Sequence, residues 1–220
     1  MEYTERIMES NDWATYLLVG CFLLLAVAKY FYPRRFDEFI LLPLSDKYLT
    51  VRGKDDAVYH PFNIMLFVIQ SVCVSIFIYL LFQAYNPVET EKNNWLFVQI
   101  YSGYTIFVLI KFSIEKIIAN VFSIDSIIDQ YLYQKLSHRN FLALLLFLAN
   151  LFFLYIFYGT RMSLLIFGIA ILLFNAIALF YSYKKNGNLI TSNFFHFILY
   201  LCALEIAPYI ILYKMFFYWG

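Results

Sequence analysis

Glu205 and Pro208 stand three residues apart in the mostly apolar run LYLCALEIAPYIILYKMF, where neither residue type is expected. A carboxyl group inside a membrane helix could carry a proton or a cation, or it could contact a polar ligand. Pro208 has no N–H to bond the carbonyl of Leu204, and its ring tends to kink a helix at that point. A free carbonyl would then lie beside the carboxyl group, provided that the run is a membrane helix.

The composition indicates that this run is a membrane helix. The chain has 220 residues, of which 63% are hydrophobic, 22% aromatic and only 14% charged, and its mean hydropathy is +0.69. Several apolar runs approach or exceed the roughly 20 residues that a helix needs to cross about 30 Å of hydrocarbon. These runs are too long for barrel strands, and a helix satisfies its own backbone hydrogen bonds in lipid. The sequence therefore predicts an all-α polytopic membrane helix bundle.

Six apolar runs are predicted to be transmembrane helices of a single domain, residues 1–220. Their bounds are 13–32, 61–85, 95–110, 141–158, 162–183 and 194–215. Most of the 16 Lys and Arg residues lie at or beyond the ends of the first, third and fifth runs. Because basic loops are retained in the cytoplasm, both termini are expected outside, an N-out and C-out topology. Tryptophan favours the membrane interface, and Trp13, Trp95 and Trp219 lie at the ends placed outside.

Residues 33–60 are predicted to form an amphipathic cytoplasmic segment, which is bracketed by Pro33 and Pro61. The segment mixes a charged start, PRRFDE, with the apolar stretch FILLPL. It could lie at the inner headgroup boundary, with its basic residues facing anionic lipid. The alternative is a solvated loop whose apolar patch packs on the bundle, and the sequence leaves both interpretations open.

A second amphipathic cytoplasmic segment is predicted over residues 111–139, because its apolar residues recur at helical spacing. We expect it on the inner surface, following the third span or continuing it. In the alternative interpretation the third span shifts to 104–124 and takes Lys111, Glu115 and Lys116 into the bilayer. Burying three charges is costly, which favours the surface segment.

Glu205 lies about eleven residues into the last run, about 17 Å along a helix and so near the membrane midplane. Its partner is not expected on the same helix, because His196 and Lys214 are each about nine residues away, on the opposite face. Three amide side chains lie at similar depth and could donate a hydrogen bond to the carboxylate. These are Gln70, Asn150 and Asn175. With Glu205 and Pro208 they form a predicted intramembrane polar layer.

Other chemistry finds little support in the sequence. Walker-type glycine loops, GxSxG and HExxH are all absent. The three histidines have no second ligand at helical spacing, and the three cysteines have no CxxC spacing. Asp125 and Asp129 are one helical turn apart and could hold Mg²⁺, although a solvated acidic face is the commoner case. The net charge of +1 gives no reason to expect nucleic-acid binding, and we expect no catalytic residue, cofactor or metal.

Three motifs carry a resemblance to a known family. They are YPRRFDEFILLP after the first run, HPFNIMLFVIQ at the start of the second, and LEIAPYIILYK in the last. Together they resemble a family of small multi-pass inner-membrane proteins from Bacteroidetes that is classed as a domain of unknown function. The resemblance covers most of the chain. It implies the bacterial inner membrane as location and brings no activity, substrate or catalytic residue.

Two functions from different classes fit these observations. The first is a non-enzymatic structural or accessory component of a membrane complex, in contact with the lipid bilayer and with a membrane-protein partner or a second copy of itself. In that case Glu205 is protonated and the polar layer makes interhelical hydrogen bonds worth about 1 kcal/mol each. The second is a small permease or proton-coupled carrier that uses Glu205. An intramembrane lipid-modifying enzyme is a more distant alternative.

Overall fold

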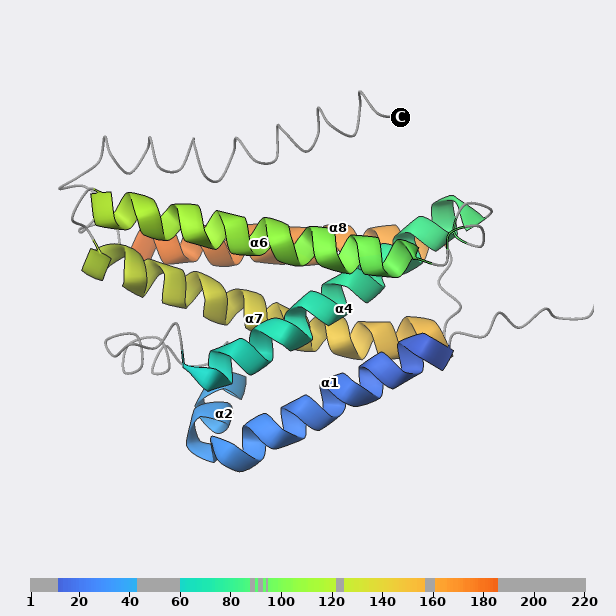
Figure 1. The fold of residues 1–220 in the computed structure, drawn as a ribbon, viewed down its shortest axis with the longest axis horizontal. Coiled ribbons are helices and arrows are strands. Elements are labelled where there is room, and N and C mark those ends of the chain that lie inside the picture. Colours follow the sequence, from blue (N-terminus) through green and yellow to red (C-terminus); the bar gives the residue numbers. More distant parts are fainter. Residues whose placement is uncertain are drawn as a thin grey trace, which may run out of the picture.

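The computed structural model describes residues 12–42, 60–87, 90, 93, 95–121, 125–156 and 161–185, and within these ranges the chain is helical without strands (Figure 1). The helices are α1 (Asp12–Phe31), α2 (Pro33–Ile40), α4 (Pro61–Tyr85), α6 (Leu96–Val121), α7 (Asp125–Tyr155) and α8 (Arg161–Lys185). The predicted all-α class is therefore confirmed. The last predicted run, 194–215, with Glu205 and Pro208, lies outside the described residues.

Four helices in the described part are long and apolar enough to cross a membrane. The stretches concerned are Asp12–Phe31, Pro61–Tyr85, Leu96–Ile117 and Leu132–Tyr155. Helix α8 is apolar over Arg161–Asn175. Large apolar side chains cover the outside of the bundle, for example Phe22 on α1 and Leu172 on α8, which are 63% and 69% exposed. An apolar exterior of this kind is suited to lipid, because an exposed patch of this extent is rare on a soluble monomer.

Helix bounds differ from the predicted runs mainly in one place. Helices α1, α4 and α8 begin and end within two residues of the runs 13–32, 61–85 and 162–183. Helix α6 does not end at residue 110, the predicted end of the third span, but continues to Val121. Helix α7 begins at Asp125, well before the expected start at residue 141. The first part of segment 111–139 thus continues the third predicted helix, as one of the two expectations had it, and the part from Asp125 belongs to α7.

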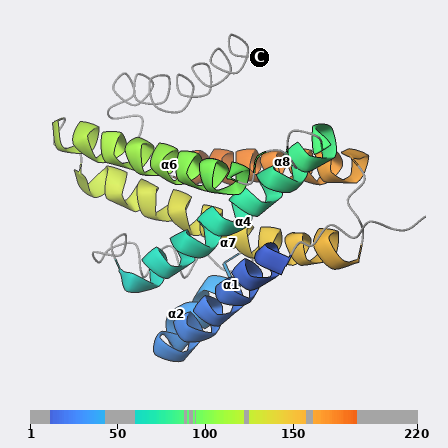
Figure 2. The ribbon, with the colours of Figure 1, turned by 45° about the vertical axis from the view of Figure 1, so that its right-hand side comes forward.

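Helix α4 occupies the centre of the bundle. It packs against α1, α6, α7 and α8, and most extensively against α7. Figures 1 and 2 show α1, α6 and α8 running in one direction, with α4 and α7 running in the other. Pro61 starts α4, and the Nδ1 atom of His60 accepts a hydrogen bond from the backbone N–H of Phe62 at 3.2 Å. A proline at the first helical position costs no hydrogen bond, which explains why α4 begins there.

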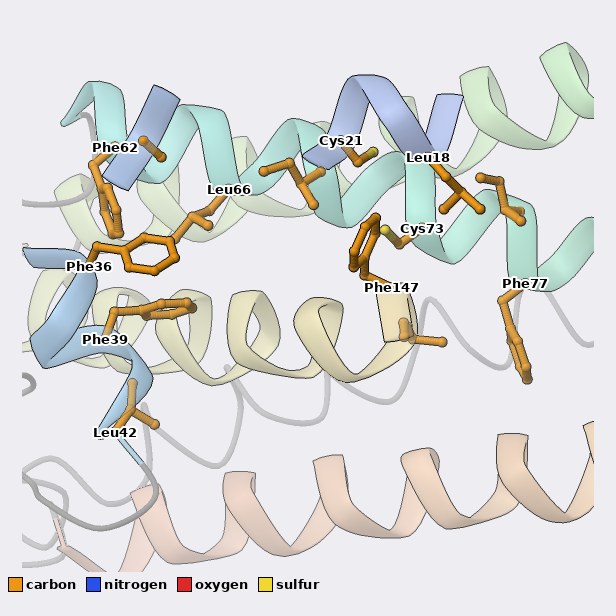
Figure 3. Packing of buried hydrophobic residues seen from close by; sticks show 14 of the residues in the cluster. Leu18, Cys21, Phe36, Phe39, Leu42, Phe62, Leu66, Cys73, Phe77 and Phe147 are labelled. Atoms are coloured by element: carbon orange, nitrogen blue, oxygen red, sulfur yellow. The ribbon is translucent and has the colours of Figure 1, made fainter. Parts of the chain in front are cut away.

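Helix α2 folds back from the end of α1 and inserts two aromatic rings into the bundle (Figure 3). The rings belong to Phe36 and Phe39, which are 8% and 0% exposed. The Phe39 ring lies 5.9 Å from that of Phe62 on α4 and 6.3 Å from that of Phe141 on α7, centroid to centroid. Residues 33–42 therefore pack on the bundle, as in the second interpretation of this segment, while residues 43–59 lie outside the described ranges.

The antiparallel arrangement gathers basic residues at one end of the bundle, here called the basic end. It comprises Lys29, Arg34, Arg35, Lys111, Lys116, Lys135 and Arg139. Aromatic rings join the helices at the opposite end. There the Trp13 ring of α1 lies 5.0 Å from that of Tyr79 on α4 and 4.7 Å from that of Phe97 on α6. The bundle thus has a basic end and an aromatic end.

Candidate functional site: interhelical polar contacts

Gln70 links three helices through its side-chain amide. It lies on α4 and is only 1% exposed. Its Nε2 atom donates to the hydroxyl oxygen of Tyr104 on α6 at 2.8 Å. Its Oε1 atom accepts from Nε of Arg139 on α7 at 3.1 Å. One buried amide therefore fixes α4, α6 and α7 relative to one another.

Asn150 makes a second contact between α7 and α4. Its side chain is completely buried, and Nδ2 donates to the backbone carbonyl of Cys73 at 2.8 Å. Within the described residues its Oδ1 atom has no hydrogen-bond partner. Since Cys73 follows Gln70 by less than one helical turn, the two amides that the sequence placed in the polar layer both serve the α4–α7 interface.

Asn175 is placed differently. It lies on α8 and is partly exposed, and the structure shows no hydrogen bond between its side chain and another described residue. Because Glu205 and Pro208 lie outside the described residues, their part in the predicted layer stays a prediction. The described part brings Gln70 and Asn150 into one interface and leaves Asn175 at its edge.

Close packing of α4 against its neighbours depends on small side chains. Ser71 and Ser75 are buried, and their hydroxyls donate to backbone carbonyls one turn earlier, of Phe67 at 3.0 Å and of Ser71 at 2.7 Å. Each hydroxyl is therefore satisfied within α4 and needs no partner from another helix. Cys21 on α1 and Cys73 on α4 are free and buried in the neighbouring contact (Figure 3).

A buried ion pair joins α6 to α7 near the basic end. The Nζ atom of Lys135 lies 2.7 Å from Oε1 of Glu115, and the two side chains are 14% and 3% exposed. The partner of Glu115 is therefore on the other arm of the hairpin formed by α6 and α7. A paired and hydrogen-bonded charge costs far less to bury than an isolated one, which explains how α6 continues through this charged stretch.

In the described residues these polar side chains make hydrogen bonds between helices. In the described part of the chain, no three His, Cys, Asp or Glu side chains come together in a way that could hold a metal ion. His60 has a structural role, since it caps α4 and its ring lies 4.9 Å from that of Tyr32. Tyr104, Arg139 and the Glu115–Lys135 pair had not been singled out as members of the polar layer.

Replacing Asn150 by leucine is expected to lower the free energy of unfolding by about 1 kcal/mol or less. Leucine has a similar volume, and interhelical hydrogen bonds in membrane proteins contribute about 0.6 kcal/mol on average. Unfolding of the detergent-solubilised protein by sodium dodecyl sulfate, followed by far-UV circular dichroism, measures the change. Asn175→Leu is the matched control and should be neutral. A loss above about 2 kcal/mol would show that Asn150 makes a further essential contact.

The described part is a helical bundle with four helices long and apolar enough to cross a membrane, and its interior polar side chains bind one another across helix interfaces. The chain belongs to the family described as a domain of unknown function, DUF4271, whose model matches residues 14–216. All six described helices fall within or overlap that range. No curated protein and no solved structure shows significant similarity to the chain. Membership of the family brings no activity or site residue.

Proposed function

We propose that this chain is a multi-pass protein of the bacterial inner membrane that acts as a structural or accessory component of a membrane complex and not as an enzyme. The supporting observation is the use made of the interior polar groups. Gln70 bonds Tyr104 and Arg139, and Asn150 bonds the Cys73 carbonyl, each across a helix interface. These groups lock helices together, which is the role of a framework.

The cavity between α7 and α8 fits the same role. Its volume is about 550 Å³, and it is lined by apolar residues, among them Leu145, Phe152, Phe167 and Phe174. A path for ions or protons needs polar groups or water along its length. None of the residues lining this cavity carries a charge, so it suits apolar contact with a lipid chain or another helix.

Helix α6 is the best candidate face for a partner. Only 6% of its apolar stretch is buried, compared with 44% in α4 and in α7. The exposed side chains include Ile106 and Ile110, one turn apart and 56% and 54% exposed. In lipid, helices associate through close packing and polar contacts, and an open face of this kind would accept a helix of another membrane protein or of a second copy.

The proposal includes the topology of the sequence analysis, with six spans and both termini outside. The basic end would then face the cytoplasm, because Lys and Arg are retained on that side. Trp13 and Trp95 lie at the other end, which suits a membrane interface there, since tryptophan favours the interface.

Co-purification tests the proposal. The tagged full-length chain is extracted from native membranes in a mild detergent, and proteins present in stoichiometric amount are identified. We expect a reproducible partner, and we expect Glu205→Gln to keep both the partner and the protein level. Protonated glutamic acid and glutamine have similar shape and hydrogen-bonding capacity. Glu205→Leu, which removes the hydrogen bonds, is expected to lower the protein level.

A different outcome would favour the alternative function. If Glu205→Gln abolished a cellular phenotype while the protein level stayed normal, the carboxyl group itself would be needed. Purification of the chain without any partner would point the same way. The two results together would support a small permease or proton-coupled carrier that uses Glu205.

A further inference from the structure

The cavity between α7 and α8 opens to the outside of the bundle. Among its lining residues, Leu148 and Phe174 are 61% and 49% exposed. The rings of Phe153 and Phe167 join its two walls, with their centroids 5.5 Å apart. Every side chain in the lining is Leu, Ile, Phe or Ala, so the walls offer neither charge nor hydrogen bonds. Only an apolar ligand matches such a lining.

The cavity is too narrow for a further helix. Its lining runs from Leu142 to Phe153 on α7 and from Phe167 to Phe174 on α8, which are lengths of about 17 Å and 11 Å at 1.5 Å per residue. Over these lengths the volume of about 550 Å³ corresponds to a mean cross-section of about 30–50 Å². A helix with its side chains is about 10–12 Å across, which gives a cross-section of about 80–110 Å². A single extended hydrocarbon chain is thinner than a helix and fits this space.

The depth of the cavity matches one leaflet of a bilayer. Helices α7 and α8 run antiparallel (Figures 1 and 2), and α7 ends at Tyr155 while α8 begins at Arg161. The inner limits of the cavity, Leu142 and Phe174, are each 13 residues from these two ends, about 20 Å along a helix. Half of a hydrocarbon core measures about 15 Å. The cavity therefore lies mainly in the leaflet at the aromatic end, where acyl chains run along the helices.

We propose that the cavity between α7 and α8 holds one acyl chain of a phospholipid from the leaflet at the aromatic end. Apolar cavities in proteins stay dry and take up apolar ligands. Walls that face an empty space lose their dispersion contacts, and a chain seated between the two helices restores them on both sides. The seated chain then belongs to the bundle, since it fills the space that α7 and α8 leave between them.

The proposal rests on the membrane location in the proposed function and not on an accessory role. Occupation of the cavity by lipid is measured on the purified chain without any partner protein. A failure to find a complex would therefore leave the lipid site standing, and a failure to find lipid in the cavity would leave the accessory role standing.

Photolabelling tests the site. The full-length chain is reconstituted in vesicles of phosphatidylethanolamine and phosphatidylglycerol with a trace of phosphatidylethanolamine that carries a diazirine in the middle of one acyl chain. After illumination, mass spectrometry of peptides locates the label. We expect more label on Leu145, in the cavity, than on Leu172, which is 69% exposed on α8 and does not line the cavity. A seated chain stays beside Leu145, whereas chains at Leu172 exchange with the bulk lipid.

Filling the cavity provides the decisive variant. Ala170→Trp places an indole in the cavity from an exposed position and should abolish the excess label on Leu145. Leu172→Trp is the matched control, because it adds the same ring outside the cavity and should leave the excess unchanged. Circular dichroism establishes that both variants are folded. Equal labelling of Leu145 and Leu172 in the wild type would overturn the proposal, as would an excess that persists in Ala170→Trp. Weaker labelling of Leu145 than of Leu172 would show that protein covers the cavity, which also contradicts the proposal.

Discussion

Glu115→Gln is expected to lower the free energy of unfolding by about 3 kcal/mol. The substitution keeps the shape of the side chain and removes its negative charge, which breaks the ion pair with the Lys135 ammonium in a site where the lysine side chain is only 14% exposed. Breaking a buried ion pair by removing one partner costs about 3–5 kcal/mol. We place Glu115→Gln at the lower end because glutamine can still accept a hydrogen bond. Detergent-to-dodecyl-sulfate unfolding, followed by circular dichroism, measures the change.

Two further variants separate the charge from the packing. In Glu115→Leu/Lys135→Met both charges are replaced by apolar side chains, and this double variant should regain most of the stability, because a buried pair can often be exchanged for apolar residues at little cost. Asp37→Asn removes one carboxylate from an exposed position on α2 and should change the free energy of unfolding by less than about 0.5 kcal/mol. If Glu115→Gln behaved like Asp37→Asn, the pair would not be buried in the folded protein.

This ion pair also explains how α6 continues beyond the predicted end of the third span. The apolar runs and the prolines at residues 33 and 61 predict α1 and α4 well, since both signals are local. The end assigned to the third span at residue 110 rested on the cost of placing Glu115 and its neighbours in lipid. That cost is relieved by Lys135, twenty residues further along the chain and on the other arm of the hairpin. No local pattern reveals a partner at that distance.

The sequence likewise identified some of the residues that make polar contacts and missed others. Counting residues from each membrane face identified Gln70 and Asn150, both of which are buried at helix interfaces. The same count gave Asn175 equal weight, but it does not show which face of α8 turns inward. Arg139 was assigned to the cytoplasmic segment because a residue count follows the backbone. Its side chain is long enough to bring the guanidinium to Gln70, so arginines within a turn of a span end are the signal to examine.

For the connection after α1, the sequence left two interpretations open: an apolar side that faces lipid, or one that packs on the bundle. The packing of Phe36 and Phe39 distinguishes them. An amphipathic stretch can place its apolar side on lipid or on protein, and the two have the same periodicity. Phe36 and Phe39 turn inward, whereas Ile40 and Leu41 stay exposed at 46% and 51%. Helix α2 therefore packs its aromatic side on the bundle and leaves its aliphatic end exposed.

Replacing Phe39 by alanine is expected to lower the free energy of unfolding by about 3–4 kcal/mol. The ring is fully buried between Phe62 and Phe141, and truncation of a buried phenylalanine costs about 3–5 kcal/mol through lost contacts and the cavity left behind. Edge-to-face ring contacts add to the loss. Because α2 has only eight residues, it depends on such contacts and not on intrinsic helix stability.

Ile40→Ala provides the matched control, since it shortens the next side chain of the same helix at a position that is 46% exposed. We expect a change of less than about 0.5 kcal/mol, measured by the same unfolding titration. Phe39→Leu should lie between the two variants, because it keeps apolar volume but loses both ring contacts. Equal stabilities of Phe39→Ala and Ile40→Ala would show that α2 is not docked on α4 and α7. The contrast thus tests whether the first connection is part of the bundle.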